Sequence, residues 1–300
     1  MKNLFSCLII ILLVSAFSCK PGPKEKDIFK PLFSSYNSDS ANTKNPVSKN
    51  EIFYGILTPV EVCEIFNRLG IPHNNAALNP TSRRNQYLSS SKASINTGIY
   101  GVDFGYLKMF GVGQEMVDYV MTIRDMSSKL GIPDNYLTDP IRKLQGDIGE
   151  PDTIMALMND AYNKMENHLR ESGRESTAGL MIMGGWVEAM FIATQLVYDP
   201  AKPDTEVVQK IAEQKYTLTT LLSFMKNYYD DPVVVYYSKK LKYLKNYFDT
   251  FDIYFKKGDL EIDTAKQVFR STGSEMNVTI ETLNKIRDYI NTLRTEMVTP

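Results

Sequence analysis

Two carboxylates lie in apolar surroundings, where they could serve as a general acid and a general base. Glu188 is the only charged residue between Ser176 and Tyr198, and Asp103 lies in an earlier apolar segment. Burial raises the pKa of a carboxyl group, and enzymes use this effect to prepare acids and bases for neutral pH. Catalysis would require the two groups to converge, about 5 to 10 Å apart, in an open cleft. We favour the alternative, in which Glu188 is a buried structural group bonded to tyrosines or to an arginine of an adjacent helix.

A second set of polar side chains follows a line of glycines in the predicted helix 92–110. At 100° per residue, Gly98, Gly101 and Gly105 fall within about 60° of each other. Glycines in a helix favour close packing against a neighbouring helix, and this is the interpretation we favour. They could also let a ligand approach a groove lined with polar groups. The candidates for such a lining are Asn96, Tyr100 and Asp103.

Tyrosines form a third candidate site, in the predicted helix 233–257. Four of them fall within about 40° of one line on this helix, and Lys242, Lys245 and Lys256 lie on its far side. Such a line could bind a sugar, an anionic polymer or a protein. It could equally be the amphipathic rim of a helix that meets solvent, which we favour. The four tyrosines are Tyr236, Tyr243, Tyr247 and Tyr254.

Several chemistries lack the residues that they need. His73 and His168 are the only histidines, and neither has a second ligand at metal-binding spacing. No phosphate-binding loop, dinucleotide fingerprint or serine-hydrolase elbow occurs. The formal net charge of -1 provides no general attraction to nucleic acid. We therefore expect no metal, no cofactor and no nucleic-acid partner, and we interpret Cys63 as a small buried hydrophobe.

The elements that must position these groups are predicted to be helices, with no convincing strand. The segment 176–198 is apolar almost all the way round, which is typical of a helix buried at the centre of a domain. A membrane span is the alternative, but a central carboxylate is costly in a bilayer. We predict an all-α domain at residues 51–300, a single bundle of eight or nine helices around 176–198. The helical segments expected are 58–69, 92–110, 114–130, 150–171, 176–198, 204–230, 233–257 and a last one that starts at Ser274, with two shorter segments at 136–147 and 263–269.

The amino terminus has the pattern of a secretory signal. A short basic start is followed by an apolar run from Leu4 to Val14 and then by small residues. Ala16-Phe17-Ser18-Cys19 resembles the lipobox of bacterial lipoproteins, although Phe17 is bulkier than the usual residue there. The resemblance implies that residues 1–18 are removed and that Cys19 carries the lipid. Residues 19–50 are rich in Pro, Gly, Ser and Asn, which predicts a flexible tether.

Together these features predict a lipid-anchored protein of the bacterial cell envelope, facing either the periplasm or the cell exterior. In general terms the helical domain also resembles uncharacterised all-helical envelope lipoproteins. We expect a non-enzymatic module that binds an envelope protein or a glycan. A carboxylate-dependent enzyme acting on an envelope polymer and a purely structural spacer are the alternatives. The sequence does not indicate the oligomeric state.

Overall fold

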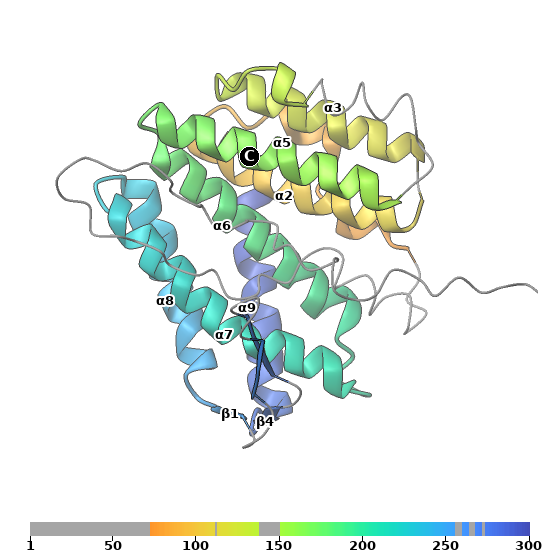
Figure 1. Ribbon diagram of the computed structural model, residues 1–300, viewed down its shortest axis with the longest axis vertical. Helices are drawn as coiled ribbons and strands as arrows, with labels where there is room; N and C mark the ends of the chain where they lie inside the picture. The colour runs from red at the N-terminus through yellow and green to blue at the C-terminus, as the bar shows by residue number, and fades with distance from the viewer. Residues whose placement is uncertain (1–72, 112, 138–150, 256–259, 264–267, 272–273) are drawn as a thin grey trace, which may run out of the picture. The chain divides into compact units, whose positions relative to one another are not determined.

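The computed structural model describes residues 73–111, 113–137, 151–255, 260–263, 268–271 and 274–300 (Figure 1). The predicted signal, Cys19, the tether, Cys63 and the helix 58–69 lie outside the described residues, as does most of the predicted helix 136–147. The described residues form an all-α protein with about nine helices, which confirms the predicted fold class. Its α-helices are α2 (Ser90–Met109), α3 (Gly113–Lys129), α5 (Pro151–Glu171), α6 (Glu175–Ile192), α7 (Thr205–Met225), α8 (Pro232–Phe248) and α9 (Ile280–Val298).

The predicted central helix is α6, which is continued by one π-helical turn, η3 (Ala193–Val197). Every residue of α6 from Ala178 to Ile192 is buried. The helix contacts α2, α5, α7, α8 and α9, and Figure 1 shows it running between α2 and α7. By length and composition Glu175–Val197 could cross a membrane, but 89% of its most apolar window is buried inside the protein. The helix is apolar on all sides because other helices of the domain pack against it on all sides.

Glycines allow α2 and α6 to approach each other at backbone distance. A Cβ added to Gly98 of α2 would lie 1.9 Å from the carbonyl oxygen of Met181, and one added to Gly184 would lie 2.1 Å from that of Ile95. Gly185 faces Gly98 across the same contact. Because real Cβ atoms cannot come so close to backbone oxygens, no other residue fits at Gly98 or Gly184 without moving a helix. At Gly98 this geometry agrees with the packing interpretation of the glycine line.

Side-chain caps explain where several helices begin. Ser89, Asp204 and Asp231 each accept a hydrogen bond from a backbone N–H in the first turn of α2, α7 and α8, respectively. These residue types are preferred at that position because a free helix end leaves its first N–H groups unpaired. In α8, Pro232 follows the cap, where a missing N–H costs nothing.

The prediction is wrong between 249 and 279. The predicted helix 233–257 ends at Phe248, and short antiparallel strands follow: β1 (Ile253–Phe255) pairs with β4 (Ser274–Met276), and β2 (Leu260–Asp263) pairs with β3 (Val268–Ser271). Of the predicted helix 263–269, the described residues lie on strands, Asp263 on β2 and Val268 and Phe269 on β3. The last helix begins at Ile280 after a Thr279 cap rather than at Ser274. The alternation Leu-Glu-Ile-Asp at 260–263 has the two-residue period of a strand, although no strand was predicted there.

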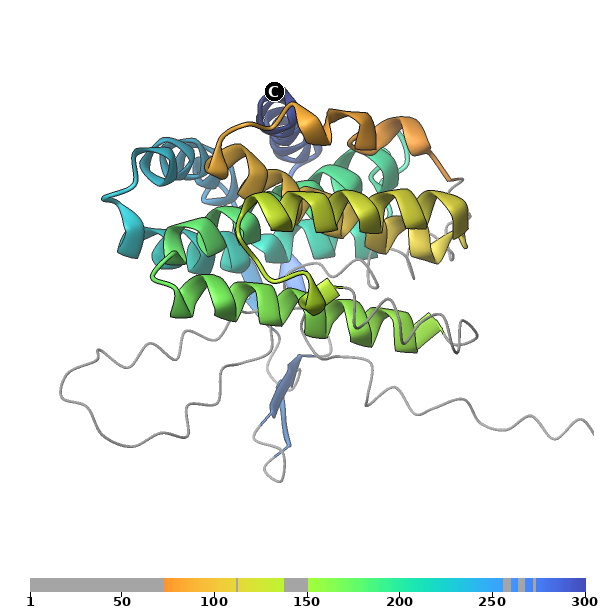
Figure 2. The same cartoon turned by 90° about the horizontal axis from the view of Figure 1, so that it is seen from above.

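The carboxyl end of α9 packs beside the first described segment of the chain. This segment holds two 3₁₀ turns, η1 (Asn75–Ala77) and η2 (Thr81–Asn85). Figure 2 shows the end of α9 next to this orange segment, and hydrogen bonds from Arg83 and Tyr87 to the Val298 carbonyl join them. The two ends of the described chain thus close over α2 and α6, where Glu188 and Asp103 are found.

Candidate functional site

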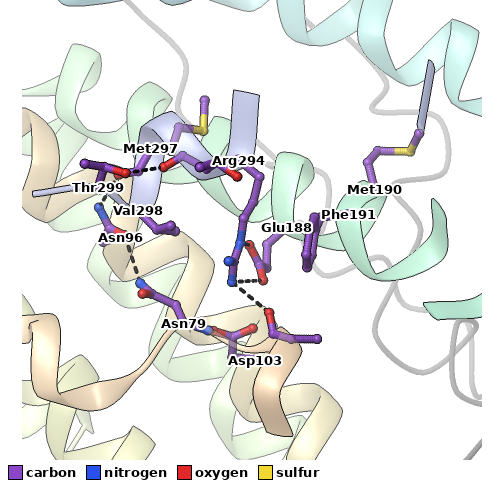
Figure 3. A network of polar contacts seen from close by, with 12 residues as sticks. Asn79, Asn96, Asp103, Glu188, Met190, Phe191, Arg294, Met297, Val298 and Thr299 are labelled. Carbon is purple, nitrogen blue, oxygen red and sulfur yellow. Dashed lines mark hydrogen bonds and ion pairs between the residues drawn. The ribbon is translucent and has the colours of Figure 1, made fainter. Parts of the chain in front are cut away.

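The two predicted carboxylates meet in the interior, together with an arginine. Glu188 of α6 and Asp103 of α2 are both 0% exposed, and Arg294 of α9 is 8% exposed. The Arg294 Nε donates to Glu188 Oε2 and its Nη2 donates to Oε1, each at 2.9 Å (Figure 3). Nη2 also donates to the Ala77 carbonyl at 3.1 Å, and the guanidinium lies 4.5 Å from the centre of the Phe191 ring. A two-pronged pair of this kind is the strongest geometry for a buried ion pair.

Asp103 lies beside this pair, in surroundings that disfavour its charged form. Burial raises the pKa of Asp103 well above its usual range, and the nearby negative charge of Glu188 raises it further. Asp103 Oδ1 is buried and accepts no hydrogen bond from the residues that the structure describes. The positive Arg294 and the backbone N–H of Asn79, which donates to Asp103 Oδ2 at 3.0 Å, act in the opposite direction. A protonated Asp103 leaves one negative and one positive charge in the cluster, so that its buried charges balance.

Other polar side chains extend this network to the end of α9. Asn79 Nδ2 donates to Asn96 Oδ1 at 3.0 Å, and Asn96 Nδ2 donates to the Met297 carbonyl at 3.1 Å (Figure 3). The Tyr87 hydroxyl donates to the Val298 carbonyl at 2.9 Å, and Lys92 Nζ donates to that of Glu296 at the same distance. The last carbonyls of a helix have no partner within the helix, and its carboxyl end carries partial negative charge. These side chains therefore cap α9.

The structure thus brings together four of the residues predicted for a site and encloses them. Asn96, Tyr100, Asp103 and Glu188 are each 0% exposed. The Tyr100 hydroxyl donates to the Pro80 carbonyl at 3.0 Å, and burial raises the pKa of Tyr100. The open cleft that catalysis by Glu188 and Asp103 would require is not present around these two side chains. We interpret the four residues, with Arg294, Asn79 and Tyr87, as a buried polar cluster that joins α2, α6 and α9.

Arg294, Asn79 and Tyr87 were missed as members of the cluster. The signal for Arg294 was present in the sequence, because it lies next to Leu293 and three residues before Met297 on the inner face of the last helix. A buried arginine needs a negatively charged partner. Glu188 is the only acidic residue between Ser176 and Tyr198 and has no basic residue near it in that segment, so the two could have been paired. Asn79 and Tyr87 lie in a segment without periodicity, where no comparable signal exists.

The two histidines occupy separate surroundings. The His168 ring packs edge-on against Tyr136 with 5.8 Å between centroids, while His73 stacks on Tyr106 at 5.5 Å. His73 Nε2 also lies 3.8 Å from a carboxylate oxygen of Glu115. Among the described residues no group of three or more His, Cys, Asp and Glu side chains could hold a metal ion.

The tyrosines of α8 form an exposed surface with a tyrosine of α9. Tyr236 is 50% exposed and Tyr243 is 53% exposed, while Tyr247 and Tyr289 are half-buried. The Tyr243 ring centroid lies 5.6 Å from that of Tyr247 and 5.2 Å from that of Tyr289. We name these four residues the tyrosine face. Tyr254 is equally exposed but lies on β1, so its predicted place on the same helix is wrong.

Polar contacts fix the tyrosine face in place. Lys240 Nζ lies 4.9 Å from the centre of the Tyr236 ring and 2.8 Å from a carboxylate oxygen of Glu296. The hydrogen bond to Glu296 is the main reason that the pKa of Lys240 is raised. The Tyr289 hydroxyl donates to the Lys240 carbonyl at 3.1 Å. The face is therefore an ordered aromatic surface open to solvent, whereas the carboxylates are enclosed.

Comparison of the chain with protein-family models, with curated protein sequences and with solved structures gave no match. We therefore infer function from the geometry of the buried polar cluster and of the tyrosine face.

Proposed function

We propose that this protein is a non-enzymatic binding module held at the bacterial cell envelope by a lipid on Cys19, and that its tyrosine face is the binding surface. The observation that carries the binding role is the ordered exposure of Tyr236 and Tyr243 on α8. Tyrosine rings offer a large contact area and a polar hydroxyl at little cost in side-chain entropy, which suits them to recognition surfaces. The buried polar cluster supports a non-enzymatic role, because its two carboxylates are shielded from solvent.

The sequence of the amino terminus supports the anchor. Ala16–Cys19 resembles a lipobox, and the segment that follows has the composition of a flexible spacer. Several acyl chains on one cysteine attach a protein stably to a bilayer, where a single chain binds only marginally. A lipid at Cys19 gives the protein a membrane attachment that leaves α6 free to serve as the core of the domain.

Metabolic labelling tests the anchor. Cells that express the full chain are grown with a palmitate analogue, and the Cys19→Ala variant provides the matched control. We expect label and membrane fractionation for the parent chain and loss of both for the variant. Equal labelling of the two chains, or a parent chain that is recovered without lipid, would refute the anchor.

Site-directed crosslinking in cells tests the binding role. A photoreactive phenylalanine analogue replaces Tyr243, and the control carries the same analogue at Tyr216, which is 39% exposed on α7. We expect a discrete crosslinked species from position 243 that is absent from position 216. The structural-spacer alternative predicts the same background at both positions, and that result would exclude a binding role for the tyrosine face.

A further inference from the structure

The chemistry of the tyrosine face indicates a ligand class. We propose that it binds an acidic polysaccharide, with sugar rings stacked on Tyr236 and Tyr243 and a carboxylate of the polymer paired with Lys239. This inference rests on the proposed binding role of the same surface. Four observations support it: the spacing of the two rings, the charge of α8, the rigidity of the face and the scarcity of other exposed apolar groups there.

The spacing suits a linear polymer. Tyr236 and Tyr243 are seven residues apart on α8, so they lie roughly 10 Å apart along the helix axis and almost in line. This distance is about the span of two linked hexose rings, so that successive residues of a polysaccharide can reach both tyrosines. Lys239 comes three residues after one tyrosine and four before the other, which makes it a surface neighbour of both.

The charge of α8 selects an anionic partner. The helix contains four lysines and no acidic residue. Lys240 is paired with Glu296 and Lys245 with Asp249, while Lys242 lies over the Tyr229 ring at 5.1 Å. Lys239 is exposed and forms no ion pair within the part of the chain that the structure describes. It therefore remains available for a negative charge on the ligand.

The face is also rigid, and among the large hydrophobic side chains only tyrosines are exposed on it. Contacts with Lys240 and Tyr289 hold the rings before any ligand arrives, which lowers the entropic cost of binding. Tyr236 and Tyr243 are the only exposed large hydrophobic residues within α8. A membrane surface or an amphipathic helix would need Leu, Phe or Trp side chains to bury. Sugar rings instead need flat aromatic surfaces with polar edges, as these tyrosines provide.

Calorimetric titration of the purified full chain in detergent tests the inference with three polymers. Polygalacturonate supplies sugar rings with carboxylates, dextran supplies uncharged sugar rings, and polyglutamate supplies carboxylates without sugar rings. We expect binding to polygalacturonate, weakened by salt, and at least about ten-fold weaker binding to the other two polymers. The same affinity for polyglutamate would show that charge alone acts and would overturn the inference. The same affinity for dextran, or no binding of polygalacturonate, would overturn it as well.

Matched variants locate the site. We expect the double variant Tyr236→Ala/Tyr243→Ala to bind polygalacturonate about ten-fold more weakly or worse, and Lys239→Gln to reduce both the affinity and its salt dependence. Tyr216→Ala on α7 and Lys285→Gln on α9 remove an exposed tyrosine and an exposed lysine elsewhere, and we expect them to bind as the parent does. Circular dichroism verifies folding. Unchanged affinity in a folded double variant would overturn the site.

The two proposals fail differently. If a discrete species crosslinks at position 243 but polygalacturonate does not bind, the tyrosine face is a binding surface for another class of partner and only the ligand inference is lost. If neither the crosslink nor the polymer is observed, the proposed function is lost too.

Discussion

Replacing Asp103 with asparagine tests the protonation of the buried polar cluster. Asp103 Oδ2 accepts a hydrogen bond from the Asn79 N–H, and Oδ1, which has no hydrogen-bond partner among the described residues, is where a proton would be carried. An asparagine keeps a carbonyl acceptor for the Asn79 N–H and has an N–H₂ group in place of the protonated oxygen, without a titratable proton. The Asp103→Asn variant therefore keeps the geometry of the cluster and removes its proton equilibrium.

The sign of the pH effect follows from the raised pKa of Asp103. Its unfolded value is near the ordinary 3.8, and its folded value is well above that. The native state thus retains a proton that the unfolded state releases, so the parent loses stability as pH rises from about 4 towards the folded pKa. The loss from one such group approaches about 1.4 kcal/mol per pH unit. The Asp103→Asn variant does not lose this stability, because asparagine has no titratable proton.

Urea unfolding between pH 4 and 8 measures the effect, and the fluorescence of Trp186, the only tryptophan and 1% exposed, reports unfolding. We expect the free energy of unfolding of the variant to exceed that of the parent by an amount that grows with pH. The exposed Asp118→Asn variant controls for the loss of a negative charge, and its difference from the parent should stay nearly constant. A gap for Asp103→Asn that is constant or narrows as pH rises would refute a protonated Asp103. Transfer of the effect to Glu188→Gln would place the proton on Glu188 instead.

Three further predictions concern stability, each measured by urea unfolding at pH 7. Gly98→Ala should destabilise the protein by at least about 1–3 kcal/mol, because its Cβ would meet a backbone oxygen. The control variant Gly113→Ala should leave stability unchanged, because its Cβ would have no neighbour within 4 Å. Equal losses of stability in the two variants would contradict the close contact between α2 and α6. Arg294→Met should cost about 3–5 kcal/mol by leaving the Glu188 charge buried and unpaired, and the double variant with Glu188→Gln should regain part of it. A double variant as unstable as the single would contradict the pairing. Tyr87→Phe should cost roughly 1 kcal/mol or more, because it removes the hydroxyl that bonds both the Val298 carbonyl and the Asn79 side chain. An unchanged stability would show that these bonds contribute nothing.

Much of the fold could be predicted because its signals are local. The uniform apolarity of 176–198 identified the central helix, and the predicted helices 204–230 and 233–257 start within one residue of α7 and α8. These properties depend on a residue and on neighbours within about one turn, so a sequence displays them directly. The strands after Phe248 were missed because each is too short for its two-residue period to stand out against the helices around it.

The sequence by itself determined that Glu188 would be buried, since no charged residue near it offers a face to solvent. It also determined that Tyr236, Tyr243 and Tyr247 would share one side of a helix. Only the tertiary structure decided that Glu188 is paired with Arg294, 106 positions away, and that Asp103 lies beside them. It alone decided that the tyrosines face solvent and that Tyr289 joins them. The physical reason is that periodicity specifies which side of a helix is buried, whereas the neighbour that covers this side depends on how close two backbones can come. Here Gly98 and Gly184 set the distance between α2 and α6.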